Sequence, residues 1–86
     1  MKIGIAGSLE SNDCLVTIKE SKEFSIKVQS IVDVFYHDQI VELITSVLED
    51  MNIKNVEVTL IDKGALNYTI KARLLTALHR MEANHA

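Results

Sequence analysis

Proline and tryptophan are absent from this 86-residue chain, and cysteine occurs only once. A single thiol, Cys14, cannot form an internal disulfide or a cysteine-rich metal site, which agrees with a reducing compartment. Glycine is limited to three residues, and no proline-rich or low-complexity segment divides the chain. The sequence therefore predicts one continuous domain over residues 1–86, small by the standard of globular domains.

Long apolar runs are also missing. The longest uninterrupted apolar stretches are a few residues, whereas a transmembrane helix needs about 18–20. The N-terminus carries Lys2 but lacks the roughly 7–15-residue apolar core of a secretory signal. Hydrophobic residues make up 48% and charged residues 24%, a composition too apolar for a disordered tail. We expect a soluble, cytoplasmic protein that does not enter a membrane.

The net charge of −3 is unevenly distributed. Residues 1–61 carry five Lys against ten Asp or Glu, a net charge of −5, whereas residues 62–86 have a net charge of +2. The cations of this basic segment are Lys63, Lys71, Arg73 and Arg80. They do not form the dense basic groove typical of nucleic-acid binding, which we therefore do not expect. The segment predicts docking to an acidic partner surface, or simply a solvated helix face.

Three segments alternate between apolar and polar residues, as half-buried strands do: 14–19, 24–28 and 55–61. In the first of them, Cys14 lies on the apolar side, so we expect its thiol in the core. The four polar residues at 20–23 have the length of a hairpin loop. The first two strands are therefore predicted to pair with each other.

Two segments show apolar residues at helical spacing, one from Asp38 to Met51 and one over 66–81. Asp38 is suited to the N-terminal cap of the first helix, and Asn52 to the left-handed residue that ends it. The stretch 31–37 fits a strand or a helix equally well. With the strands, the predicted order is β-β-α-β-α. The fold class is α+β, a small, largely antiparallel sheet of three to four strands with two amphipathic helices packed on one face.

Side chains suited to catalysis are sparse. His37, His79 and His85 lack the spacing of metal ligands, and no glycine-rich nucleotide-binding motif is present. We expect no catalytic residues and no metal site. The polar segment 6–13, ahead of the first predicted strand, has the composition of a turn. Taken alone, it indicates only a change of chain direction, because a serine without an adjacent base is a weak nucleophile.

Two separated motifs, however, resemble those of the citrate lyase acyl carrier protein family, the gamma chain of that enzyme. Ala-Gly-Ser-Leu-Glu-Ser-Asn-Asp at 6–13 is similar to its Ala-Gly-Ser/Thr-Leu-Glu-Ser-x-Asp signature. Asp-Lys-Gly-Ala-Leu at 62–66, followed by Lys-Ala-Arg-Leu at 71–74, resembles its second signature. The departures from the family pattern are Asn12 for Ser or Gly, Cys14 for an aliphatic residue and Asn67 for Asp.

This resemblance implies a non-catalytic carrier. In the family, the serine of the Leu-Glu-Ser triplet, which matches Ser11, bears 2′-(5″-phosphoribosyl)-3′-dephospho-coenzyme A through a phosphodiester. The alpha chain exchanges the acetyl group on the thiol of that arm for citrate, and the beta chain cleaves the citryl thioester to oxaloacetate and acetyl thioester. Implied partners are these two subunits and the transferase that modifies Ser11.

Other functions remain open at this point. A related carrier, such as that of malonate decarboxylase, has a similar organisation with a different complex. A third possible function is that of a small protein-interaction module, in which Ser11 is only a turn residue. The flanking charges of Glu10 and Asp13 have two interpretations: they repel an anionic donor, so that attachment needs a dedicated transferase, or they recruit the metal ion of that transferase.

Overall fold

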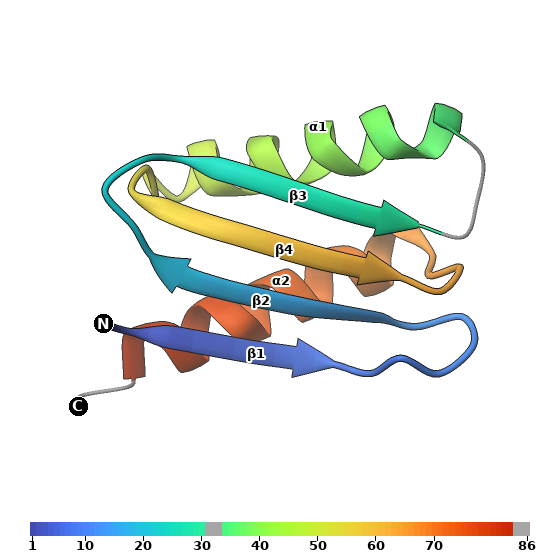
Figure 1. Cartoon of the computed structure of the whole chain (residues 1–86), viewed down its shortest axis with the longest axis horizontal. Helices are drawn as coiled ribbons and strands as arrows, with labels where there is room; N and C mark the ends of the chain where they lie inside the picture. Colours follow the sequence, from blue (N-terminus) through green and yellow to red (C-terminus); the bar gives the residue numbers. More distant parts are fainter. Residues whose placement is uncertain (31–33, 84–86) are drawn as a thin grey trace.

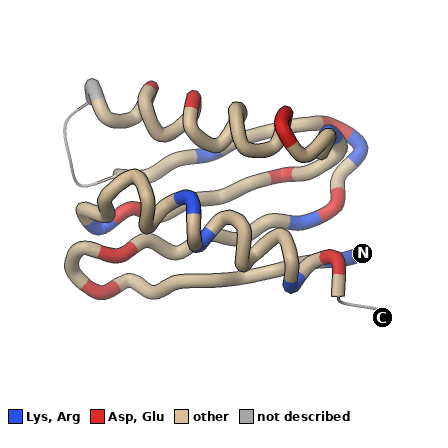
Figure 2. Tube along the Cα trace, turned by 180° about the vertical axis from the view of Figure 1, so that it is seen from behind, with Lys and Arg blue, Asp and Glu red and all other residues tan. Residues whose placement is uncertain are grey.

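The computed structural model describes residues 1–30 and 34–83. The elements are β1 (Ile3–Gly7), β2 (Cys14–Glu20), β3 (Ser25–Ser30), α1 (Val34–Asp50), β4 (Val56–Asp62) and α2 (Asn67–Ala83). Within the described residues, the strands form one sheet in the order β1-β2-β4-β3. Both helices lie on the same face of this sheet (Figure 1, and from behind in Figure 2). The predicted α+β class and the one-sided helix layer are confirmed.

The core lies between the helices and the two central strands. Alternate residues of the strands are buried beneath the helices, as their period of two predicts. These residues are Cys14, Val16 and Ile18 of β2 and Val56, Val58 and Leu60 of β4. The helical stripes close the core from above, with Ile40, Ile44 and Leu48 of α1 and Ile70, Leu74 and Leu78 of α2. Helix α2 covers β1 and β2, whereas α1 covers β3.

The predicted hairpin is wrong, because β4 lies between β2 and β3. Strand β4 pairs antiparallel with β2 and parallel with β3. The connection at 21–24 must therefore cross two strand spacings, about 10 Å. Four residues at about 3.3 Å each can span that distance. The parallel pair instead needs a long crossover, which α1 provides.

Strand β1 is the element missing from the predicted order. It pairs antiparallel with β2 along the edge of the sheet. Its buried positions are Gly4 and Ala6, whereas Ile3 and Ile5 are 40% and 48% exposed on the open face. A Cβ atom on Gly4 would lie 1.8 Å from the carbonyl oxygen of Ala77. The absence of a side chain at Gly4 therefore lets α2 rest directly on the strand backbone.

Helix α1 begins at Val34, not at Asp38, so the predicted N-terminal cap is wrong. Asp38 lies in the second turn, where its carboxylate is 3.5 Å from Nδ1 of His37. Part of the ambiguous stretch, 34–37, is thus helical, while 31–33 lies outside the described residues. The predicted end is confirmed: Asn52 has a φ of 60°, and the amide of Ile53 donates to the carbonyl of Leu48.

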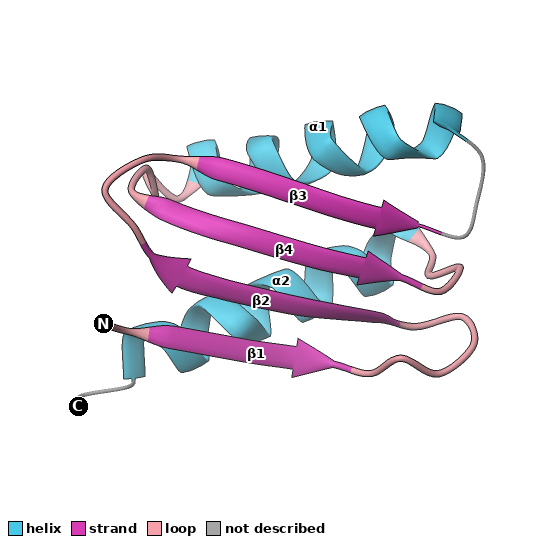
Figure 3. Cartoon of the chain, in the orientation of Figure 1, coloured by secondary structure: helices cyan, strands magenta, loops and turns pink. Residues whose placement is uncertain are grey.

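One end of the sheet brings together the segments that carry the two sequence motifs. The β1–β2 loop and the β4–α2 loop lie side by side there, at the end of the sheet where α2 begins (Figure 3). None of the helices in the described ranges has the length and apolarity needed to cross a bilayer.

Candidate functional site

The β1–β2 loop presents Ser11 in a tight turn. The amide of Asp13 donates to the carbonyl of Glu10 over 3.2 Å, closing a four-residue turn. Asn12, the third residue of this turn, has a φ of 66°, a conformation that asparagine tolerates and that a type II turn needs at this position. The departure from the family pattern at Asn12 therefore preserves the turn. Ser11, the second residue, is exposed.

The base of the loop is fixed by Gly7. Its φ is 98°, and a Cβ atom there would lie 1.8 Å from the carbonyl oxygen of Cys14. The amide of Ser8 donates to that same carbonyl over 3.1 Å. Only glycine fits this position, because both the backbone conformation and the available space exclude a side chain. The two ends of the loop, where it leaves β1 and enters β2, are therefore held together by close backbone contact.

The two serines of the loop differ in what their hydroxyls do. Ser8 Oγ donates to Asp13 Oδ2 over 2.7 Å and accepts a hydrogen bond from the amide of Glu10. For Ser11 Oγ, residues 1–30 and 34–83 supply no hydrogen-bond partner. Ser8 is thus part of the internal structure of the loop, and the Ser11 hydroxyl is free to react.

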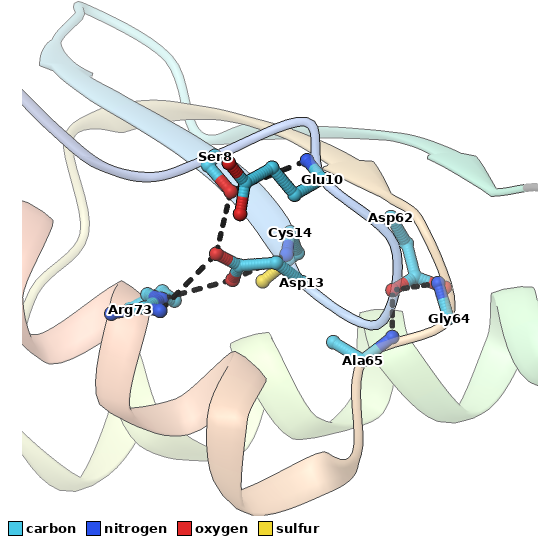
Figure 4. Close-up of polar contacts among 8 residues, drawn as sticks. All are labelled: Ser8, Glu10, Asp13, Cys14, Asp62, Gly64, Ala65 and Arg73. Atoms are coloured by element: carbon cyan, nitrogen blue, oxygen red, sulfur yellow. Dashed lines mark hydrogen bonds and ion pairs between the residues drawn. The ribbon is translucent and has the colours of Figure 1, made fainter.

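Asp13 braces the loop from inside (Figure 4). Besides Ser8, its carboxylate accepts from the amide of Cys14 at 2.7 Å and from Nε and Nη2 of Arg73 at 3.0 and 3.2 Å. The hydrogen bonds from Arg73, Ser8 and the Cys14 amide lower the pKa of Asp13 from 3.8 to about 2. Its charge is therefore compensated within the chain. The two predicted roles toward the donor or a metal ion stay predictions for Asp13 and for the exposed Glu10.

The second motif holds the outer side of the same loop. The amide of Asn12 donates to the carbonyl of Lys63 over 2.8 Å, and the amide of Lys63 donates to the carbonyl of Asp13 over 2.9 Å. Asp62, only 2% exposed, shapes this segment by accepting from the amides of Gly64 and Ala65. The two motifs, far apart in the sequence, therefore form one structure around Ser11.

Sequence reasoning missed these positioning roles of Asp13, Asp62 and Arg73. All three residues lie inside the two sequence motifs, and this position was the only sign in the sequence of a role at the site. The sequence does not reveal which of these side chains contact one another. Arg80 is also engaged, since its Nη1 donates to the carbonyl of Ile5 over 2.7 Å. Of the four cations predicted to form either a docking surface or a solvated helix face, Arg73 and Arg80 thus make internal contacts.

Cys14 lies in the core, as predicted, and is fully buried. Burial, together with the nearby carboxylates of Asp13 and Asp62, raises the pKa of its thiol to about 11. Nucleophilic attack needs the thiolate, so this cysteine is chemically inert at neutral pH. In the described part of the chain, no group of three or more His, Cys, Asp or Glu side chains is arranged to hold a metal ion.

Known proteins share the sequence and the fold of this chain. The family model described as "Malonate decarboxylase delta subunit (MdcD)" matches residues 1–81. A citrate lyase acyl carrier protein of Latilactobacillus sakei is 44% identical over 92% of this chain and 79% of its own length. A citrate lyase acyl carrier protein of Treponema denticola is 42% identical over 88% of this chain and 87% of its own length.

Among solved structures, a chain of a Pseudomonas malonate decarboxylase hetero-tetramer in complex with malonate superimposes with a TM-score of 0.75. The superposition covers 93% of this chain and 84% of the Pseudomonas chain, at 17% sequence identity. It establishes that the two chains share a fold. On the strength of the model match and of relatives above 40% identity over most of their length, this chain belongs to the family of citrate lyase acyl carrier proteins, which are carrier subunits rather than catalytic ones.

Proposed function

We propose that this chain, as a single carrier domain over residues 1–86, bears 2′-(5″-phosphoribosyl)-3′-dephospho-coenzyme A on Ser11 in a cytoplasmic citrate lyase complex. The observation that carries the proposal is the free, exposed hydroxyl of Ser11 on a loop held rigid from both sides. The residues fit the group, because attachment through a phosphodiester needs one accessible hydroxyl and space around it. No other serine of the loop meets that need, since Ser8 is internally bonded.

The contribution of the chain is placement. The bound group supplies a thiol that carries the acyl unit as a thioester. The rigid loop fixes where this arm begins, and docking of the carrier to the alpha and beta subunits makes each encounter intramolecular. Such tethering raises the effective concentration of the acyl group to about the millimolar range. For attachment, Ser11 gives up its proton to a base that the transferase must supply, because the loop lacks one. Its Oγ then forms a bond to the phosphorus of an activated nucleotide donor, while the bond from that phosphorus to the donor's phosphate leaving group breaks and the leaving group departs as the free anion.

The carrier of a malonate decarboxylase complex is the second candidate. It is favoured by the description of the matching family model and by the shared fold with a chain of the Pseudomonas hetero-tetramer. Citrate lyase is preferred because the curated relatives at 41–44% identity are named for it. Reconstitution of the loaded chain with purified citrate lyase alpha and beta subunits tests the choice. Citrate cleavage supports it, and activity only with malonate decarboxylase subunits would reverse it.

Loading of the protein tests the carrier function itself. Coexpressed with the transferase of a citrate lyase system and its nucleotide donor, the chain is expected to gain the mass of one prosthetic group. Expression without the transferase provides the control, and intact mass spectrometry gives the measurement. A chain that stays unmodified under conditions that load a citrate lyase acyl carrier relative would leave the interaction module as the better explanation.

Cys14→Ala is expected to leave acyl transfer near normal, because the buried thiol has a pKa of about 11 and does not reach solvent. The substitution removes one buried sulfur and should lower the free energy of unfolding by about 1 kcal/mol. Transfer rates in the reconstituted complex and a denaturant titration provide the measurements. A folded Cys14→Ala protein that loads normally but fails to transfer acyl groups would assign the thiol a role in the reaction.

Docking through the basic segment now rests on Lys63 and Lys71. The cations on the helix side of the sheet lie on α2 and on the β4–α2 loop that precedes it. Helix α1, by contrast, carries Asp and Glu but no Lys or Arg (Figure 2). Neither Lys63 nor Lys71 forms an ion pair within the described residues. Lys71→Glu is expected to weaken assembly with the larger subunits by about three- to tenfold at low salt and less at high salt.

Lys54→Glu, which makes the same charge change outside the basic segment, is the matched control for that experiment. Affinities are measured by sedimentation or calorimetry across ionic strength. Equal affinities for Lys71→Glu and the unchanged protein at every salt concentration would exclude this docking surface.

A further inference from the structure

A small hollow opens beside the β4–α2 loop, which contacts the loop that presents Ser11. It has a volume of about 240 Å³ and lies between the first turns of α1, the β4–α2 loop and the start of α2. Its lining is predominantly apolar, with one aromatic ring, two carboxamides and the carboxylate of Asp62, which is only 2% exposed. The residues that matter here are Tyr36, Gln39, Ile40, Leu66, Asn67 and Ile70.

Gly64 and Ala65 of the β4–α2 loop also line the hollow, and this loop contacts the Ser11 loop through the backbone hydrogen bonds between Lys63 and residues 12 and 13. Asn12 Oδ1 lies 3.6 Å from the position that a Cβ atom on Gly64 would take. The backbone amide of Asn12 is bonded to the neighbouring Lys63 carbonyl. Figure 4 shows Gly64 and Ala65 directly next to the turn of the loop. Ser11 directly precedes Asn12, so a group attached to Ser11 begins next to the residue that contacts the β4–α2 loop, and this loop forms one wall of the hollow.

The size and lining of the hollow select a flat heteroaromatic ring. Pockets that enclose a drug-sized molecule have roughly 300–1,000 Å³, so about 240 Å³ suits one ring system and not a whole coenzyme. Tyr36, 52% exposed, offers a ring face for stacking, and Leu66, 60% exposed, offers an apolar contact. The carboxamides of Gln39 and Asn67 carry the donor and acceptor pair that matches the edge of adenine.

On the basis of the proposed function, we propose that this hollow holds the adenine ring of the prosthetic group attached to Ser11. In that group, one phosphate and one ribose separate the serine from the adenosine, so adenine cannot move far from the loop. The acyl-bearing thiol lies beyond the adenosine on the far side of the diphosphate. Seating the adenine moves the pivot of the arm from Ser11 to the hollow and leaves the thiol end free to reach two active sites.

The test compares apo and loaded protein, with loading verified by intact mass. In the loaded chain, we expect backbone amide shifts at Ile40 and at 64–67 in ¹⁵N-correlated NMR spectra. Nuclear Overhauser contacts should also join adenine protons to the ring protons of Tyr36. Tyr36→Ala should lose both sets of changes while still gaining one prosthetic group. Tyr68→Ala is the matched control, because Tyr68 is 73% exposed, lies close to the hollow in sequence and does not line it.

The outcomes separate this inference from the proposed function. Absence of any mass gain contradicts the proposed function, and the adenine site falls with it. Full loading at Ser11 with unchanged shifts at Ile40 and 64–67 contradicts the adenine site alone. Shifts that grow with protein concentration and are identical in apo protein would assign the hollow to a second copy of the chain, which also overturns the inference.

Discussion

Ser11→Ala is expected to abolish attachment of the prosthetic group completely while leaving the fold intact. The side chain is exposed, and within the described residues its hydroxyl has no partner, so its loss changes the free energy of unfolding by no more than about 0.5 kcal/mol. The reacting oxygen, by contrast, has no substitute in the loop. Coexpression with the transferase, followed by intact mass and a denaturant titration, measures both effects.

Ser8→Ala is the control that makes this result specific to one hydroxyl. Ser8 shares the loop with Ser11, but its hydroxyl is bonded to Asp13 at 2.7 Å. Ser8→Ala should therefore still gain one group, more slowly than the unchanged chain because the loop loses a contact. A Ser11→Ala protein that is modified, or a Ser8→Ala protein that cannot be, would show that Ser11 is not the attachment site.

The elements that were predicted correctly are those whose buried face is also the hydrophobic face. β2 and β4 alternate, and α2 carries an apolar stripe, so local pattern and burial agree. β1 was missed because the relation is inverted there. Its buried residues are the small Gly4 and Ala6, and its large residues Ile3 and Ile5 lie on the open face. A close approach of helix to strand requires small residues, and hydrophobic periodicity cannot detect them.

Strand pairing was beyond the sequence for a different reason. A four-residue connection is compatible with a hairpin and equally with a step across one intervening strand. The choice depends on β4, which begins only at Val56, after α1, and pairs with both neighbours. Similarly, a local motif suffices to propose Ser11, whereas the basic segment predicts for Arg73 only a docking surface or a solvated face, and its contact with Asp13, 60 residues away, is not predicted. Contacts between residues far apart in the sequence decide both the strand order and the partner of Arg73. Such contacts cannot be recognised from the local patterns of a single sequence.

Those non-local contacts lead to the second large expected effect. Asp13→Ala should slow attachment at Ser11 by up to about a hundredfold, because small displacements of a reacting group cost that much in rate. The substitution removes the acceptor of the Ser8 hydroxyl, the Cys14 amide and the Arg73 guanidinium together. Asp50→Ala, at the far end of α1, removes an exposed carboxylate of the same kind and should have no effect on the rate. Transferase kinetics provide the measurement.

Since Asp13 and Arg73 act as one unit, Arg73→Gln should slow attachment as well, and the double variant should be little worse than Asp13→Ala alone. The amides of Asn12 and Lys63 should shift in both variants, which a mere loss of surface charge would not produce. Independent, additive losses would contradict a shared brace. Loading of Asp13→Ala at the normal rate would contradict the role of the brace in positioning Ser11.

The pH dependence of the loop tests the same brace without the transferase. The pKa of Asp13 is lowered from 3.8 to about 2, so the folded state holds this carboxylate ionised more strongly than the unfolded chain does. The stabilisation is therefore fully present above about pH 4 and is lost as the pH falls toward 2. The ¹³C shift of the Asp13 carboxyl should titrate near pH 2 in the unchanged chain and closer to 3.8 in Arg73→Gln, because the guanidinium is the largest cause of the shift. An Asp13 carboxyl that titrates at its ordinary pKa in both proteins would show that Arg73 does not hold the loop in solution, and the rate effect expected for Asp13→Ala would lose its physical basis.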